Sequence, residues 1–272
     1  MIKKGVTFVV QGPLTEEGLR GIHNYKKLGE VIVSCWDFDP PHVIKKIPKG
    51  VKVIVNSFKE DNSYNFQNIK YQIESSLKGL LEVKTDFVVK VRSDEYFTKM
   101  NKFVSSVYFH PEKLTVCNFL FRKRALFHPS DHVFGGKVET LIKMFDNSKK
   151  MISCYKKDET VDIERLGFKK EYTKGQQFIF NRLTAEMTFC LCYLKVKGID
   201  VISDIKNMDK EEVLDYHRRV MQNNYRLVRA SELGHFLFRY KTNTEKGGPT
   251  AFTNEEDFLN YRIGSITSLE DL

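Results

Sequence analysis

No stretch of this 272-residue sequence approaches the roughly 18 consecutive apolar residues that cross a membrane as a helix. The N-terminus begins with a basic and then an apolar stretch, but Gln11-Gly12-Pro13 ends it without a small-residue cleavage site. The cysteines are few, odd in number and without the spacing of a disulfide framework, so we expect reduced thiols. These absences predict a cytoplasmic protein without a signal peptide or a transmembrane segment.

Several motifs that identify common functions are also missing. The sequence contains no G-x-G-x-x-G dinucleotide motif, no G-x-x-x-x-G-K-[ST] phosphate loop and no G-x-S-x-G nucleophile motif. It has no internal repeat, no low-complexity tract and no linker rich in Pro, Gly or Ser. We therefore expect one domain over residues 1–272.

The composition is that of a folded, basic protein. Hydrophobic residues make up 41% of the chain and aromatic residues 12%, which is enough to bury a sizeable core without disulfides. The formal net charge is +9. A charge of this size is compatible with nucleic acid, nucleotide phosphates or an anionic membrane as the partner, and does not choose among them.

Short runs rich in Val and Ile alternate with helical patterns in the first half of the chain. We expect strands at residues 6–10, 31–35, 51–55 and 87–91, each buried on both faces. Helical patterns occupy residues 14–28 and 64–83. This alternation predicts an α/β fold, with a Rossmann-like, mostly parallel sheet flanked by helices.

The second half has a mixed pattern. Residues 115–121 are a candidate strand, for which an antiparallel direction is one option. Helical patterns occupy residues 139–145, 176–197 and 210–223, which predicts a helical C-terminal elaboration of the α/β fold. Residues 250–272 are polar and locally acidic, as in a covering segment or a tail.

Polar side chains follow each of the four expected strands. In an open parallel sheet, ligands bind in the crevice beyond the carboxyl ends of the strands, so these side chains predict a ligand pocket. Taken one by one, they are equally explained as turns and helix caps. They are Gln11, Gly12 and Pro13, then Trp36, Asp37 and Asp39, then Asn56 and Ser57, and finally Arg92, Ser93, Asp94 and Glu95.

The most informative segment is Lys90-Val91-Arg92-Ser93-Asp94-Glu95. The carboxylates of Asp94 and Glu95 suit a hard divalent cation, Mn²⁺ or Mg²⁺, that bridges a diphosphate. Lys90 and Arg92 are suited to neutralising phosphate charge directly. The alternative is a surface turn in which the aspartate caps the next segment.

A second candidate group lies in the expected helix after the third strand. Asn68 and Gln72 are four residues apart and would share a face near the helix start, where backbone N–H groups attract anions. We expect a nucleotide or phosphate there. A solvated polar face explains the same pattern.

The third candidate group is His128-Pro129-Ser130-Asp131-His132. Two histidines and an aspartate are candidate zinc ligands, and Asp131 is a candidate general base. The proline interrupts the helical register that would hold both histidines on one face, which disfavours zinc. A packed turn is the remaining interpretation. Cys190 and Cys192 lie in an apolar helical stretch and are expected in the core.

Five segments in order resemble the WavE family of lipopolysaccharide-synthesis proteins, over roughly residues 5–180. The family members are expected to be glycosyltransferases, and the layout is similar to the GT-A glycosyltransferase fold. The chain departs from the family pattern at Tyr71, where the family often has arginine. The segments are Val9-Val10-Gln11-Gly12-Pro13, Val31-Ile32-Val33-Ser34-Cys35-Trp36, Asn68-Ile69-Lys70-Tyr71-Gln72-Ile73 with Gly79-Leu80, Val89-Lys90-Val91-Arg92-Ser93-Asp94 and Ser130-Asp131-His132-Val133-Phe134-Gly135.

The resemblance implies roles for these positions. Arg92-Ser93-Asp94 would take the place of the acidic metal motif of GT-A enzymes, with Glu95 as a second carboxylate. The donor pocket would be formed in the half of the chain covering residues 1–125, and the acceptor side by residues 126–272. The residues implied beside the donor nucleotide are Gln11, Gly12, Pro13, Trp36, Asp37, Asn68 and Gln72.

The sequence thus predicts a transfer of sugar from a nucleotide-sugar to a hydroxyl of a surface glycan, either of lipopolysaccharide type or on a viral glycoprotein. In an inverting reaction, Asp131 is the first candidate for the base and Glu171 the second. The acceptor would be a glycan or glycolipid, and the positive charge is compatible with peripheral contact to the inner face of an anionic membrane. No nucleic-acid partner is expected.

Two alternatives remain at this point. Residues 119–124 and 236–241 interleave aromatic and basic side chains, as in proteins that bind single-stranded nucleic acid, although neither matches a known motif. The other alternative is a catalytically inactive relative that still binds nucleotides.

Overall fold

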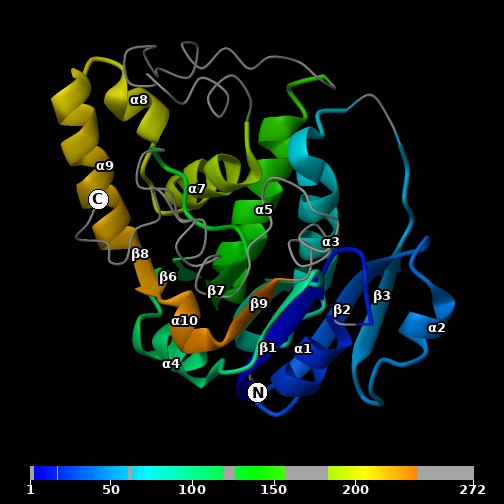
Figure 1. Ribbon diagram of the computed structural model, residues 1–272. Helices are drawn as coiled ribbons and strands as arrows, with labels where there is room; N and C mark the ends of the chain where they lie inside the picture. The colour runs from blue at the N-terminus through cyan, green and yellow to red at the C-terminus, as the bar shows by residue number, and fades with distance from the viewer. Residues whose placement is uncertain (1–2, 17, 61–62, 119–125, 157–182, 238–272) are drawn as a thin grey trace, which may run out of the picture.

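The structure is a computed structural model, and it describes residues 3–16, 18–60, 63–118, 126–156 and 183–237 (Figure 1). It contains a mixed sheet with helices on both faces, which confirms the expected α/β class. The strands of this sheet, in spatial order, are β3 (Lys52–Asn56), β2 (Glu30–Trp36), β1 (Lys3–Gln11), β4 (Thr85–Arg92), β7 (Val133–Lys137), β6 (Leu114–Cys117) and β8 (Tyr225–Val228).

Strands β1 to β4 are parallel, as expected, and β1 lies at their centre between β2 and β4. Strand β7 is antiparallel to both of its neighbours, β4 and β6. Strand β6 is parallel to β8. The antiparallel strand is therefore β7 rather than the candidate at residues 115–121, of which β6 keeps the first three residues.

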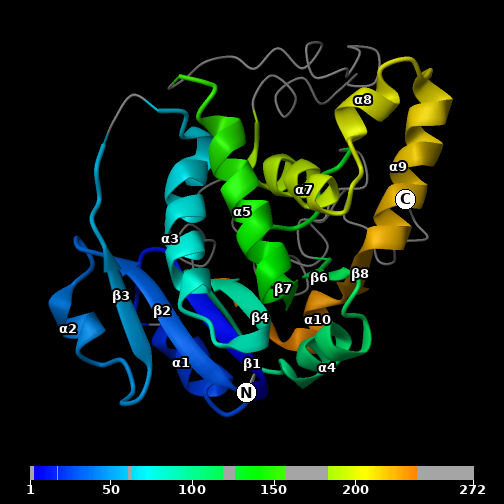
Figure 2. The ribbon, with the colours of Figure 1, turned by 180° about the vertical axis from the view of Figure 1, so that it is seen from behind.

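Helices cover both faces of the sheet (Figures 1 and 2). A short second sheet pairs β5 (Glu95–Phe97) with β9 (His235–Leu237). The helices are α1 (Gly18–Tyr25), α2 (Pro41–Ile44), the 3-10 helix η1 (Phe66–Asn68), α3 (Ile69–Leu81), α4 (Asn101–Phe109), α5 (Val138–Ile152), α7 (Ala185–Val196), α8 (Val201–Ile205), α9 (Lys210–Asn224) and α10 (Ala230–Leu233).

Alternating residues of the central strands supply two hydrophobic cores. In β1, Val9 faces the core built with α3, α5 and α7, while Phe8 and Val10 face the core built with α1 and α4. This is the period-two alternation of a strand that is covered on both sides. The edge strand β3 differs, because Val55 is 52% exposed, so the expectation of burial on both faces is wrong for that strand.

Local sequence explains where several helices begin. Asp209 and Glu212 form a capping box at the start of α9, which begins at the expected residue. Thr184 accepts a hydrogen bond from the Met187 N–H and caps α7, so this helix begins at Ala185. Of the longer expectation for that helix, residues 176–182 lie outside the described part of the chain.

Two further features concern the cysteines and the helices of the described residues. None of the five cysteines forms a disulfide with a described residue, and Cys190 and Cys192 are buried within α7, as expected. Within the same residues, no helix combines the length and the apolar character that a membrane crossing requires. The polar stretch at residues 250–272 lies outside the described residues.

Candidate active site

The carboxyl end of β4 lies beside the amino end of β7, and charged groups from both strands meet there. Lys90 is completely buried; its Nζ donates to the Asp131 carbonyl oxygen at 2.8 Å and lies 5.3 Å from the Phe134 ring centre. Burial lowers the pKa of Lys90 to about 8. Lys90 therefore holds the chain at Asp131 and does not reach solvent.

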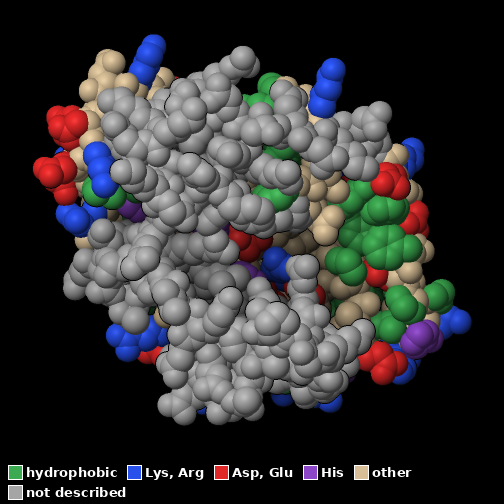
Figure 3. Space-filling model, turned by 45° about the horizontal axis from the view of Figure 1, so that its top comes forward, with side chains coloured by type: hydrophobic (Ala, Val, Ile, Leu, Met, Phe, Trp, Pro, Cys, Tyr) green, Lys and Arg blue, Asp and Glu red, His purple; other side chains and the backbone are tan. Residues whose placement is uncertain are grey.

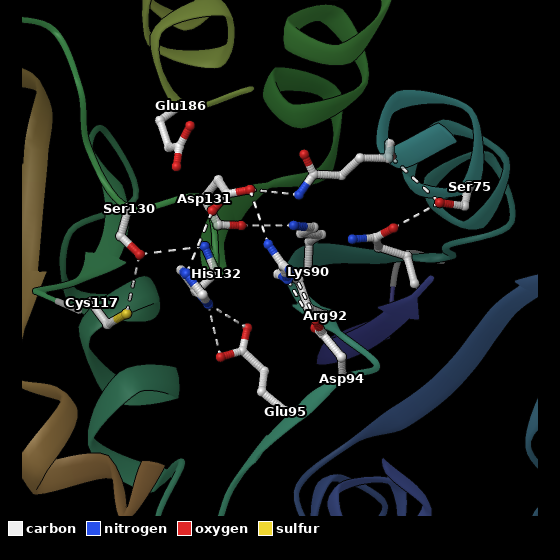
Figure 4. Close-up of polar contacts among 12 residues, drawn as sticks. Ser75, Lys90, Arg92, Asp94, Glu95, Cys117, Ser130, Asp131, His132 and Glu186 are labelled. Atoms are coloured by element: carbon white, nitrogen blue, oxygen red, sulfur yellow. Dashed lines mark hydrogen bonds and ion pairs between the residues drawn. The ribbon is translucent and has the colours of Figure 1, made fainter. Parts of the chain in front are cut away.

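Arg92 forms the centre of an ion-pair cluster (Figure 4). Its Nε and Nη2 donate to Oδ1 and Oδ2 of Asp94 at 2.9 and 2.7 Å, which is a bidentate pair. Its Nη1 lies 3.6 Å from Oδ2 of Asp131. The Arg92 side chain remains 22% exposed, so it is the cation of this cluster that faces the open side.

Asp131 lies just before β7 and is held from several sides. Gln72 of α3 donates from Nε2 to Asp131 Oδ2 at 2.6 Å. Burial alone would raise the pKa of Asp131, but electrostatic interactions with Arg92, His132 and Lys90 outweigh it and lower the pKa to about 2. Asp131 is therefore ionised at neutral pH. Its Oδ1 makes no hydrogen bond to any described residue.

Glu95 and His132 form a second buried pair. Both carboxylate oxygens of Glu95 lie near Nδ1 of His132, at 3.0 and 3.1 Å. The Glu95 side chain is 0% exposed and that of His132 is 4% exposed. Nε2 of His132 lies 3.8 Å from Asp131 Oδ1, so the imidazole lies between two carboxylates.

The turn after β1 packs directly against the turn after β4. Ser93 donates from its N–H to the Gln11 carbonyl at 2.9 Å and from Oγ to the Pro13 carbonyl at 2.6 Å. Gly12 has a φ of +114°, and a Cβ there would lie 2.9 Å from the Ser93 Oγ. The site therefore requires a glycine at this position. Ser75 donates to Gln11 Oε1 at 2.7 Å and fixes that amide.

Asp39 joins the turns that follow β1 and β2. Its two carboxylate oxygens accept the N–H groups of Trp36 at 2.8 Å and Leu14 at 3.1 Å. Burial raises the pKa of Asp39, although these two hydrogen bonds oppose the shift. Asp37, in contrast, is exposed and accepts the Phe58 N–H at 3.1 Å.

Aromatic side chains gather at the same edge of the sheet. Trp36, Phe38, Phe58 and Tyr71 form ring contacts with centre-to-centre distances of 4.7–6.2 Å. Trp36 is buried, while Phe38 is 53% and Phe58 42% exposed. Figure 3 shows hydrophobic side chains beside a hollow in which charged side chains of both signs are visible.

The structure brings most of the predicted site residues together, but Asn68 differs from expectation. Asn68 is left-handed, with a φ of +62°, and precedes α3. It is exposed and does not share a helical face with Gln72, so the expected i, i+4 relation is wrong. Glu171 lies outside the described residues.

Glu186 is a candidate that no sequence pattern indicated. It lies in the first turn of α7, its side chain is 12% exposed, and its Oε2 is 3.6 Å from His128 Nε2. Figure 4 shows its carboxylate pointing toward the Asp131 side of the cluster. No local motif marks this residue, because its position depends on how α7 packs over β7. The roles of Ser75 and of His132 as the partner of Glu95 were not predicted for the same reason.

The predicted metal ligands do not fit a cation in this arrangement. A divalent cation needs several oxygen atoms directed at one point. Here, both oxygens of Asp94 face Arg92 and both oxygens of Glu95 face His132. Among the described residues, no group of three or more His, Cys, Asp or Glu side chains is arranged to hold a metal, including the candidate zinc ligands around Asp131.

Comparison with solved structures gave distant similarities. HddC from Yersinia pseudotuberculosis complexed with GMP-PN is 12% identical, with 52% of this chain and 79% of that chain covered and a TM-score of 0.35. Glucosyl-3-phosphoglycerate synthase from Mycobacterium tuberculosis, in complex with Mn²⁺, UDP and phosphoglyceric acid, is 13% identical, with coverages of 52% and 58% and a TM-score of 0.36. Comparison with curated proteins gave no significant match.

The family comparison covers nearly the whole chain. The model described as WavE lipopolysaccharide synthesis matches residues 6–268. This range includes every residue named at the site, and it extends well beyond the part of the chain in which the individual motifs resemble the family. The chain therefore belongs to the WavE lipopolysaccharide synthesis family.

Proposed function

We propose that the protein transfers a sugar from a nucleoside-diphosphate sugar to a hydroxyl of a surface glycan, of lipopolysaccharide type or on a viral glycoprotein. Membership of a lipopolysaccharide-synthesis family supports the glycan substrate. The polar residues at the carboxyl edge of the sheet support a nucleotide-sugar donor, because ligands of such sheets bind there. The cluster of Arg92, Asp94 and Asp131 is the observation that carries the proposal.

The donor would lie across the ends of β1, β2 and β4. The turn at Gln11, Gly12 and Pro13 would lie against it, with Trp36 and Asp37 at the side of β2. Gln72 would act through Asp131, to which it donates a hydrogen bond. Asn68, exposed before α3, would contact the donor only from the rim of the pocket.

In the proposed reaction, the acceptor oxygen attacks the anomeric carbon of the donor sugar. The bond from that carbon to the diphosphate breaks, and the diphosphate leaves with the bonding electrons. For an inverting reaction, a carboxylate takes the proton of the acceptor hydroxyl. We assign this role to Asp131, whose Oδ1 has no hydrogen-bond partner among the described residues. Glu186 and Glu171 are the other candidates.

The acceptor is proposed to be a glycan or glycolipid. The net charge of +9 suits an anionic glycolipid or peripheral contact with an anionic membrane surface. A divalent cation, Mn²⁺ or Mg²⁺, would neutralise the leaving diphosphate if the site held one, but the carboxylates in this arrangement do not form its ligand set. No step of the proposed reaction depends on it.

A thermal-shift panel with UDP, GDP, CDP and CMP, each with and without Mn²⁺, tests this proposal. A ligand that binds only the folded state raises its stability as the site saturates. A shift with one nucleoside diphosphate would support the transferase and identify the donor class. If no nucleotide shifts the midpoint, the proposal is wrong.

A further inference from the structure

Two carboxylates follow β4, as in a metal site, but each already has a cationic or imidazole partner. The oxygens of Asp94 are bound by the Arg92 guanidinium, while Glu95 is bound by His132. Figure 4 shows the Asp94 carboxylate against Arg92 and the Glu95 carboxylate against His132. The group available to a donor at this edge of the sheet is therefore the Arg92 guanidinium, which is paired with the Asp94 carboxylate.

We propose that Arg92 itself binds the donor diphosphate and that Asp94 is the counter-ion which the diphosphate displaces, so that donor binding needs no divalent cation. This inference rests on the proposed function, because it concerns how the same donor is held. It changes the role of Asp94 from a metal ligand to an internal competitor of the diphosphate.

Arg92 has the chemistry and the position for this role. The planar guanidinium binds phosphate in the same bidentate geometry as it binds a carboxylate, so one ligand can replace the other. Its side chain is 22% exposed, whereas Lys90 is completely buried and donates to the Asp131 carbonyl. Lys90 supports the site from behind and does not compete for the diphosphate.

Asp94 is also the carboxylate that is most easily released. Its side chain is 26% exposed, so it can be hydrated once it leaves Arg92. Asp131 and Glu95, at 4% and 0% exposure, keep partners of their own in Gln72 and His132. The exchange replaces one anion on Arg92 with another and leaves no buried charge unpaired, which is what makes it energetically accessible.

The test is calorimetric titration of the full chain with UDP, GDP and CDP, once with EDTA and once with Mn²⁺. For the nucleotide that binds, we expect dissociation constants within about threefold of each other in the two buffers. In EDTA, Asp94→Asn should bind at least as tightly as the unmodified protein, because the competing anion is gone. If Asp94 were a metal ligand, the same variant would instead lose the binding that Mn²⁺ supports, so in the Mn²⁺ buffer the two roles predict opposite signs.

Arg92→Lys provides the complementary variant. It keeps the positive charge beside Asp131, which protects the fold, but it removes the bidentate fork, so we expect nucleotide binding to weaken by about tenfold or more. The matched controls are Asp215→Asn and Arg218→Lys, which alter an exposed Arg–Asp pair (2.7 Å) on α9 and should leave binding unchanged. If Arg92→Lys does not fold, the sign of the Asp94→Asn effect decides alone.

The outcomes separate this inference from the function on which it rests. Binding that requires Mn²⁺ and disappears in Asp94→Asn would overturn the inference and leave the transferase intact. Failure of the unmodified protein to bind any of the three nucleotides in either buffer would overturn both. Binding in EDTA that is retained in Asp94→Asn and weakened in Arg92→Lys supports it.

Discussion

Gly12 has little freedom to change at the site. Its φ of +114° is unfavourable for any other residue, and a Cβ would lie 2.9 Å from the Ser93 Oγ. That hydroxyl donates to the Pro13 carbonyl, so the turns after β1 and β4 would have to separate. One glycine therefore permits the close approach of two loops of the candidate site.

We predict that Gly12→Ala lowers the free energy of unfolding by about 1–3 kcal/mol and weakens nucleotide binding. Chemical denaturation and calorimetry measure the two effects. Gly198→Ala is the matched control, because Gly198 also has a positive φ, +79°, but nothing lies within 4 Å of the position that a Cβ would take there. The control should cost only about 1 kcal/mol. Equal losses in both variants would show that the Ser93 contact costs nothing.

Asp131 is the residue on which the proposed chemistry depends. We predict that Asp131→Asn lowers the release of nucleoside diphosphate from the sugar donor by roughly a hundredfold or more, as expected for loss of a general base. Nucleotide affinity should change little, because the amide oxygen of the variant side chain would still accept a hydrogen bond from Gln72. The measurement is steady-state turnover together with calorimetry.

Unchanged turnover in Asp131→Asn would remove Asp131 from the mechanism and direct attention to Glu186 and Glu171. An unmodified protein that binds the nucleotide but releases no diphosphate with any donor would instead support the inactive-relative alternative. Glu186→Gln tests the other described candidate for the base in the same turnover assay. Glu186 lies in the first turn of α7, and its Oε2 makes no hydrogen bond within the described residues.

At the scale of elements, α9 helps to hold the segment that leads to Asp131. His217 of α9 accepts the Phe127 N–H at its Nδ1, at 3.2 Å, and its ring meets the Phe127 ring edge to face at 4.8 Å. Phe127 has a φ of +52°, an unfavourable conformation for a bulky residue. The contact with His217 compensates for this local cost just before the Asp131 segment begins.

His217 should also make stability depend on pH. Burial lowers its pKa to about 3, whereas an unfolded histidine titrates near pH 6.5. Between these two values the unfolded chain binds the extra proton, so stability falls as the pH falls. The largest slope from this one group is about 1.4 kcal/mol per pH unit. We predict that His217→Asn is less stable at pH 7 but has a shallower dependence between about pH 6.5 and 5.

Urea denaturation at several pH values between about 5 and 7 measures this slope. His42→Asn is the control for an exposed histidine, because the His42 side chain is 67% exposed. An identical slope in His217→Asn and the unmodified protein would mean that folding does not lower the pKa of His217.

At the scale of the whole molecule, the net charge of +9 is the feature that favours binding to nucleic acid. Of the two aromatic and basic stretches, residues 119–124 and 238–241 lie outside the described part of the chain. We predict that the full chain does not bind a generic single-stranded oligonucleotide at micromolar concentration in physiological salt. Fluorescence anisotropy over a salt series measures this. Saturable binding with a log–log salt slope of about −0.7 for each phosphate contacted would support the alternative instead.

The arrangement of the sheet was only partly predictable. Val9 and its neighbours in β1 are apolar on both faces of the strand, as in a strand covered by helices on both sides. The parallel strands of the sheet could therefore be inferred from local patterns. Strand β7 could not, because Phe134-Gly135-Gly136 has little of the pattern of a strand and depends on pairing with β4 and β6. The exposure of Val55 in β3 could not be predicted either, because a short apolar strand has a similar sequence at the edge of a sheet and at its centre.

The candidate site divides in the same way. The residues at the carboxyl edge follow from the order of strands in the sequence, because the ends of parallel strands meet at one edge. Their partners do not follow, since Lys90 and Asp131 are 41 residues apart and Gln72 and Asp131 are 59 apart. Local periodicity specifies which side chains are buried, whereas the pairing of Asp131 with Gln72 and of Glu95 with His132 depends on which elements the folded chain brings together.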